Sequence, residues 1–214
     1  AGALHGLLTV FPPAQDSVTN WVSPARDVVF LVDTSGSMDG DSIGQAKAGL
    51  KRCLGMLRPE DCFTIVRFSS DFSSFTPDLR PATPSRVEAG REYVSSLVAD
   101  GGTEMQKALR HVLDLIADSE KVPMIVFLTD GCVGNEDSLM ALLASSLGRG
   151  RLFSFGIGSA PNALLLQKVA EIGRGESRFI RSHEDVGRVM SDFFETLATP
   201  MLTDIRIKWL DEAG

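Results

Sequence analysis

The 214-residue sequence has no feature that would fix a small fold covalently or place it in a membrane. No run approaches the ~18 consecutive apolar residues of a membrane span, and no basic-then-apolar stretch resembles a signal peptide. Three cysteines (Cys53, Cys62 and Cys132) cannot all pair within one chain, and none belongs to a Cys-x-x-Cys motif. With only three scattered histidines, zinc has poor support. A chain of this length buries roughly 70% of its unfolded surface on folding, so it needs neither a disulfide nor a zinc site to stabilise its core. We expect a mature or excised soluble domain.

Positive charge is also scarce. The formal net charge is −7 and the pI is near 5.0, which argues against a general binder of nucleic-acid phosphates. The segment Gly156-Ile157-Gly158 begins like a dinucleotide-binding fingerprint but lacks the third glycine and follows a late strand. We therefore expect no nucleic acid and no nucleotide as a partner, and no direct membrane insertion.

Apolar residues are arranged as alternating strands and helices. Two continuous runs, residues 28–32 and 124–128, predict strands buried on both faces, as in a parallel sheet. Shorter strands are predicted at residues 63–68, 152–157 and 177–180. Apolar stripes at three- and four-residue spacing predict helices at residues 41–57, 103–117 and 184–197, with weaker ones after Pro84, Glu136 and Pro161. This order predicts an α/β fold with a doubly wound (Rossmann-like), mostly parallel sheet flanked by helices.

The two ends of the chain have a different pattern. Residues 4–11 and 203–209 alternate apolar and polar side chains, which is typical of strands with one wet face. We therefore expect extra strands at the N- and C-termini. The predicted organisation is an N-terminal strand and connector over residues 1–22, one domain over residues 23–200, and a C-terminal strand extension over residues 201–214.

Both buried strands end in an aspartate, Asp33 and Asp130. In open α/β sheets, ligands bind beyond the carboxyl ends of strands where the strand order reverses. If these two strands flank that reversal, two carboxylates face one crevice and need a cation between them. Ser35, Ser37 and Thr103 add hydroxyl oxygens. An all-oxygen set favours Mg²⁺, Mn²⁺ or Ca²⁺ over zinc or copper.

These motifs resemble those of a known family. Asp-x-Ser-x-Ser at residues 33–37, the threonine of Gly-Gly-Thr at 101–103 and the aspartate of Thr-Asp-Gly at 129–131 are similar to the von Willebrand factor type A domain. The sequences of residues 101–105, 130–136 and 201–205 resemble those of the same domain in inter-alpha-trypsin inhibitor heavy chain-like proteins. The resemblance covers roughly residues 27–197. Cys132 stands where we expect a small residue.

The resemblance implies a metal-ion-dependent adhesion site made of Asp33, Ser35, Ser37, Thr103 and Asp130. It implies that the serines bind Mg²⁺ (or Mn²⁺ or Ca²⁺) directly, that an aspartate often acts through water, and that a partner carboxylate completes the coordination. The implied partner is a protein or extracellular-matrix ligand. The resemblance also slightly favours an extracellular, bacterial cell-surface or periplasmic location, and an intracellular location remains an alternative. We expect this fragment to be monomeric and part of a longer multidomain chain.

Each site residue also has a structural interpretation. Asp33 could cap a turn, Thr103 and Gln106 could form a helix capping box, and Asp130-Gly131 is a common turn dipeptide. Their joint occurrence at predicted strand ends favours the metal site. Two alternatives remain. One is a Mg²⁺-dependent phosphoryl-transfer enzyme with Asp33 as nucleophile, which lacks an evident second acid or base because Ser35 stands there. The other is a scaffold with a vestigial site. We expect no enzyme.

Overall fold

The computed structural model describes residues 9, 23–131, 135–158, 161–180 and 186–198 of the chain. The predicted terminal strands at residues 4–11 and 203–209 lie outside this part, apart from residue 9, so the boundaries predicted at 22 and 201 stay predictions. Within the described residues, no helix is long and apolar enough to cross a membrane.

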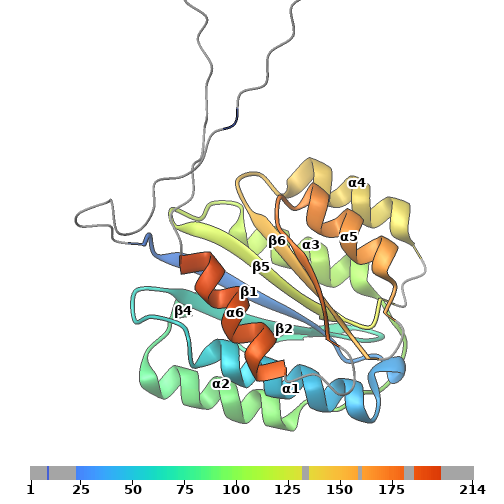
Figure 1. Cartoon of the computed structure of the whole chain (residues 1–214), viewed down its shortest axis with the longest axis horizontal. Coiled ribbons are helices and arrows are strands. Elements are labelled where there is room, and N and C mark those ends of the chain that lie inside the picture. Colours follow the sequence, from blue (N-terminus) through green and yellow to red (C-terminus); the bar gives the residue numbers. More distant parts are fainter. Residues whose placement is uncertain (1–8, 10–22, 132–134, 159–160, 181–185, 199–214) are drawn as a thin grey trace, which may run out of the picture.

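A mostly parallel sheet forms the centre of the domain, in the order β3-β2-β1-β5-β6-β7 with β4 beside β2 (Figure 1). The parallel strands are β1 (Arg26–Asp33), β2 (Cys62–Phe68), β5 (Val122–Thr129), β6 (Arg151–Ile157) and β7 (Ser177–Ile180). Two short strands, β3 (Phe72–Ser74) and β4 (Arg80–Pro81), pair antiparallel with β2. The predicted doubly wound fold is therefore confirmed.

Helices cover both faces of the sheet (Figure 1). One face carries α1 (Asp41–Leu54), α2 (Pro84–Ser96) and α6 (Val186–Ala198), and the other carries α3 (Met105–Ile116), α4 (Glu136–Ser146) and α5 (Ala163–Ile172). An apolar core lies on each face of the sheet, and alternate residues of β1 belong to the two cores. Val28 and Phe30 pack toward the first group of helices, whereas Val29 and Leu31 pack toward the second. This double burial explains the unbroken apolar run.

Helices α2 and α5 each begin after a residue whose side chain caps the helix. Thr83 caps α2: its side chain accepts a hydrogen bond from the Arg86 amide, and Pro84 is the first helical residue. Helix α5 begins at Ala163, and Asn162 caps it by accepting a hydrogen bond from the Leu165 amide at 3.1 Å, so Pro161 lies before the cap.

Helix α6 packs closely on α1 at a glycine. A Cβ atom built on Gly49 would lie 2.9 Å from Val186 Cγ1 and 3.1 Å from Met190 Cε. Gly44 lies on the same helix, and a Cβ there would meet nothing within 4 Å. The two glycines therefore form a matched pair, one in a tight interface and one in open space.

We expect Gly49→Ala to destabilise the domain and Gly44→Ala to stabilise it. Both gain about 0.8–1 kcal/mol of helix propensity, but overpacking at Gly49 costs about 1–3 kcal/mol. Urea unfolding measures the free energy of unfolding of each variant. Because both gain the same helix propensity, the difference between the two values gives the cost of overpacking at Gly49. Equal stabilities for the two variants would show that α6 moves away from α1 at no cost.

Candidate metal centre

The ends of β1 and β5 define one edge of the sheet. The two strands are parallel neighbours, and Val32 of β1 pairs with Leu128 of β5. Asp33 is the last residue of β1 and Asp130 directly follows β5, so the two aspartates lie at the same end of neighbouring strands. From β1 the chain continues through α1 to β2 on one side, whereas β5, β6 and β7 extend on the other. The strand order thus reverses between β1 and β5, as the interpretation of the two aspartates required.

Asp33 is fully buried and is held from two strands. Its Oδ1 accepts a hydrogen bond from the Ser35 amide at 2.8 Å, and its Oδ2 accepts from the Thr129 hydroxyl at 2.6 Å. The Gly131 amide in turn donates to Thr129 Oγ1 at 2.9 Å. Sequence reasoning did not assign this contact of Thr129, and its only signal was the place of Thr129 before Asp130. Both oxygens of Asp33 therefore already have a donor, and its orientation is fixed.

Burial raises the pKa of the Asp33 carboxyl. Hydrogen bonds from Ser35 and Thr129 act in the opposite direction, and the nearby charge of Asp130 raises the pKa further. The charge of Asp130 thus disfavours ionisation of the buried Asp33. A cation between them would reverse that balance.

Ser35 and Ser37 bring two hydroxyl oxygens together. A single 3₁₀ turn, Gly36–Met38, follows Ser35, and its Met38 amide donates to the Ser35 carbonyl at 3.0 Å. This turn places Ser35 Oγ 3.1 Å from Ser37 Oγ. Adjacent ligands of an octahedral Mg²⁺ with bonds of about 2.1 Å are separated by about 3 Å. The hydroxyl pair therefore has the spacing of two neighbouring ligands of one cation. Ser35 is buried, and Ser37 is exposed.

The loop that carries Thr103 is fastened to the ends of β1 and β2. The Asp100 amide donates to the Thr34 carbonyl at 2.8 Å, and the Glu104 amide donates to the Ser69 carbonyl at 2.7 Å. Half-buried Thr103 lies inside this loop. These bonds bring the loop to the same edge of the sheet as Asp33.

Close approach of the backbone also explains Gly101 in this loop. The Gly36 amide donates to the Gly101 carbonyl at 3.0 Å. Gly101 has a φ of +78°, and a Cβ atom on it would lie 2.6 Å from Ser70 Oγ. A side chain at residue 101 would therefore strain the backbone and displace the Ser70 hydroxyl.

The capping-box interpretation of Thr103 with Gln106 is wrong. Helix α3 begins at Met105, Glu104 occupies the capping position, and no side chain caps the helix. The predicted start of this helix at residue 103 was therefore two residues early. Thr103 lies before the helix, in the loop at the same edge of the sheet as Asp33.

Asp130 is half-buried at the end of β5, and its backbone carbonyl accepts from the Asn162 amide at 3.1 Å. Gly131 follows with a φ of +81°, and a Cβ there would lie 2.7 Å from Asn162 Cβ. This contact explains the glycine after Asp130. Cys132 lies outside the described residues.

The donor set of this edge consists of oxygen atoms. Within the described part of the chain, no group of three or more His, Cys, Asp or Glu side chains could hold a metal. The five predicted residues instead contribute two carboxylates and three hydroxyls, a set that fits a hard divalent cation such as Mg²⁺ and not zinc.

A sheet that reverses between β1 and β5, with Asp-x-Ser-x-Ser at that reversal, defines a class of domain. The family model of the von Willebrand factor type A domain matches residues 26–179, and the chain belongs to this family. Over 201 residues it is 31% identical to inter-alpha-trypsin inhibitor heavy chain H4 of Homo sapiens, an alignment that covers 88% of this chain and 22% of that protein. The chain thus spans about a fifth of the length of the curated relatives it matches.

Solved structures share the fold. The von Willebrand factor type A protein from Catenulispora acidiphila superimposes with a TM-score of 0.69 at 26% identity, covering 81% of this chain and 42% of that one. The pilus adhesin SpaC from Lactobacillus rhamnosus GG gives a TM-score of 0.68 at 16% identity, covering 84% and 31% respectively. At that identity, the likeness to SpaC is one of fold.

Proposed function

We propose that this domain is a divalent-metal-dependent protein-binding module and that Asp33, Ser35, Ser37, Thr103 and Asp130 hold the cation. The observation that carries the proposal is the pair of serine hydroxyls 3.1 Å apart beside the buried Asp33. Two hydrogen bonds orient the Asp33 carboxylate, and we infer that it acts on the cation through water. Mg²⁺ keeps such waters readily.

The chemistry of these ligands favours capture of an anion from outside. Neutral hydroxyl ligands leave most of the charge of a divalent cation unquenched, so the cation attracts an external carboxylate. The net charge of −7 makes general attraction of acidic proteins weak, so recognition is local. We infer that the partner is a protein or matrix ligand that presents an aspartate or glutamate. The inter-alpha-trypsin inhibitor heavy chain among the similar proteins supports this binding role over catalysis.

The test uses two short peptides that differ only in one residue, aspartate or asparagine at the centre. The aspartate peptide should bind the domain in Mn²⁺ and lose binding in a chelator, whereas the asparagine peptide should not bind. Ser37→Ala should weaken binding because it removes one of the paired hydroxyls, and Asp41→Ala, at an exposed acidic residue outside the set, should not. Isothermal titration calorimetry measures both.

Equal binding of the two peptides, or binding that persists in chelator, would contradict the proposal. Turnover of a phosphate ester that vanishes in Asp33→Asn would instead establish the phosphoryl-transfer alternative. A domain that binds neither metal nor peptide would be a scaffold with a vestigial site.

A further inference from the structure

A cysteine and a lysine are in contact at the edge of the sheet opposite the candidate metal centre. Lys121 Nζ lies 3.0 Å from Cys62 Sγ and also donates to the Glu60 carbonyl at 2.7 Å. The carboxylate of Asp27 is 3.9 Å from the same nitrogen. Cys62 is the first residue of β2, and Lys121 directly precedes β5. The pair thus joins segments on either side of β1.

This pair is open to small molecules. Both residues line a cavity of about 530 Å³, and the Lys121 side chain is 31% exposed. Five acidic residues also line the cavity: Asp27, Asp78, Asp114, Asp118 and Glu120. A small neutral oxidant such as hydrogen peroxide therefore has access, whereas an anionic thiol such as glutathione is repelled.

Cys53 provides a contrast within the same chain. It is fully buried on α1, and burial raises the pKa of its thiol far above the ordinary value. A buried, protonated thiol is inert toward oxidants. Selective oxidation of Cys62 over Cys53 is therefore expected from exposure alone.

We propose that Cys62 and Lys121 form an oxidative covalent cross-link. In the first step, the Cys62 sulfur attacks hydrogen peroxide: an S–O bond forms, the O–O bond breaks, and one water leaves. This oxidises the sulfur by two electrons to a sulfenic acid. In the second step, Lys121 loses a proton to solvent and its nitrogen attacks the sulfur. An S–N bond forms, the S–O bond breaks, and a second water leaves. Thiol, ammonium and peroxide thus give a sulfenamide, two waters and one proton.

The surroundings favour lysine as the group that attacks the sulfenic acid. Sulfenic acids condense with a neighbouring thiol or nitrogen, and at this edge of the described structure the nitrogen of Lys121 is the nucleophile in contact. Burial lowers the pKa of Lys121, but contact with Cys62 and the charges of Asp27 and Asp61 outweigh it and raise the pKa overall. The amine is therefore protonated before the reaction, which accounts for the proton released in the second step.

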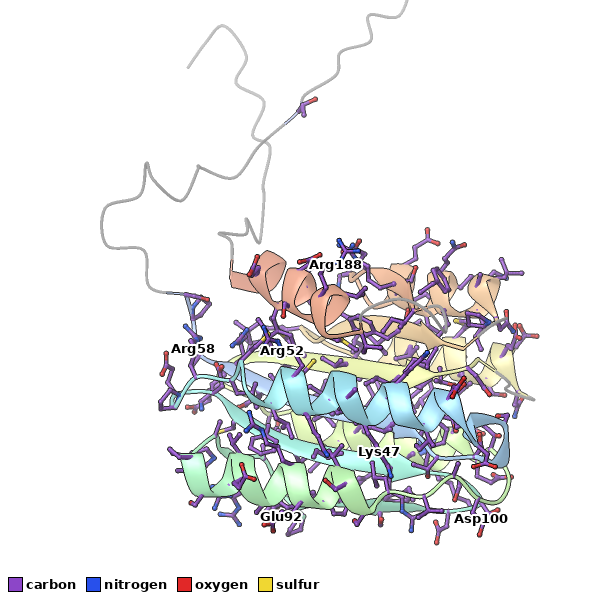
Figure 2. All side chains as sticks on the ribbon, turned by 60° about the horizontal axis from the view of Figure 1, so that its bottom comes forward. Lys47, Arg52, Arg58, Glu92, Asp100 and Arg188 are labelled. Atoms are coloured by element: carbon purple, nitrogen blue, oxygen red, sulfur yellow. The ribbon has the colours of Figure 1, made fainter. Side chains whose placement is uncertain are left out.

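The cross-link would fasten three central strands together. Asp27 of β1 pairs with Cys62 on one side and with Pro123 on the other, so a bond from Cys62 to Lys121 spans the start of β1. Such a bond closes a long loop and reduces the freedom of the unfolded chain. We expect the oxidised form to melt several degrees higher. The metal centre lies at the other end of the sheet, on the side of Asp100 and away from Arg58 in Figure 2.

The experiment treats the full chain carrying Cys132→Ser with hydrogen peroxide, then digests it and measures peptide masses. A linked pair of peptides containing residues 62 and 121, about 2 Da lighter than their sum, is expected and should disappear after treatment with dithiothreitol. Lys121→Arg is the matched control, because it keeps the positive charge but its guanidinium stays protonated. In this variant Cys62 should oxidise without linking. Cys62→Ser should show neither product.

Three outcomes would overturn the proposal. The first is a Cys62 thiol that remains unreacted, and the second is oxidation of Cys62 to sulfinic acid to the same extent in the parent chain and in Lys121→Arg. The third is a disulfide between Cys62 and Cys132 in the natural sequence in place of the lysine link. A melting temperature of the linked form that rises equally with and without chelator would show that the effect is independent of the metal centre and of its proposed function.

Discussion

Replacing Asp61 with alanine is expected to lower the free energy of unfolding by about 3–5 kcal/mol, because it leaves a buried arginine without its counter-charge. The Asp61 side chain is fully buried and that of Arg26 is 5% exposed. Asp61 accepts the Arg26 backbone amide at 2.9 Å and the Arg26 guanidinium at 2.6 Å. With Asp61 removed, these donors stay buried and lose their acceptor.

The same carboxylate also fixes the position of Arg58. Asp61 accepts the Arg58 amide at 2.9 Å and its guanidinium at 3.1 Å. Arg58 in turn donates to the carbonyls of Ser23 and Pro24, at 2.8 and 2.7 Å. Loss of Asp61 would therefore loosen the segment that leads into β1, in addition to β1 itself.

Urea unfolding of Asp61→Ala measures this cost. Asp78→Ala is the matched control: it breaks the exposed pair of Asp78 with Arg80 and should cost less than about 1 kcal/mol. If Asp61→Ala also stayed within that limit, water would have to replace the carboxylate at no cost. The prediction that Asp61 is required to pair the buried Arg26 in the absence of water would then be wrong.

The pH dependence of stability gives a second measurement on Asp61. Burial alone would raise its pKa, but hydrogen bonds from Arg26 and Arg58 outweigh burial and lower it. A lowered pKa in the folded state means that ionised Asp61 contributes stability above the unfolded value of about 3.9. That contribution is lost as the pH falls through the folded pKa. The variant should therefore lose less stability than the parent chain in this acid range.

The fold could be predicted from sequence because long elements carry a repeated pattern. The apolar runs at 28–32 and 124–128 lie inside β1 and β5, and the predicted strand at 177–180 coincides with β7. The sequence analysis did not predict the two short strands β3 and β4, because strands of three and two residues show no periodicity. Their structure depends on pairing with β2, which sequence pattern does not record.

The site could be predicted only in part. Strand ends fix where Asp33 and Asp130 lie, so their meeting followed from topology. The hydrogen bond from Thr129 to Asp33 joins residues 96 apart, and the pair of Arg26 with Asp61 joins residues 35 apart. Such contacts depend on the direction of side chains across neighbouring strands. A single sequence carries no record of that direction.

Asp33→Asn is expected to change stability in opposite directions with and without metal. Without metal, the variant should melt higher than the parent chain at neutral pH, because it removes an ionised carboxylate that burial and Asp130 both disfavour. With Mg²⁺, the parent chain should gain about 2.7 kcal/mol at a hundredfold excess over the dissociation constant, and the variant should gain little. Thermal melting with Mg²⁺ or chelator measures all four states, and Asp41→Ala should respond like the parent chain.

The sign of the metal-free effect follows from linkage. The folded-state pKa of Asp33 is raised, so its protonated form contributes stability below the unfolded value of about 3.9. This contribution is lost as the pH rises through the folded pKa, and asparagine, which does not ionise, loses nothing. The gap between variant and parent chain without metal should therefore widen from acid to neutral pH, and Mg²⁺ should reverse it. A metal-free variant that melts lower than the parent chain at neutral pH would show that the two hydrogen bonds to Asp33 outweigh its burial, and equal gains in Mg²⁺ would place the cation elsewhere.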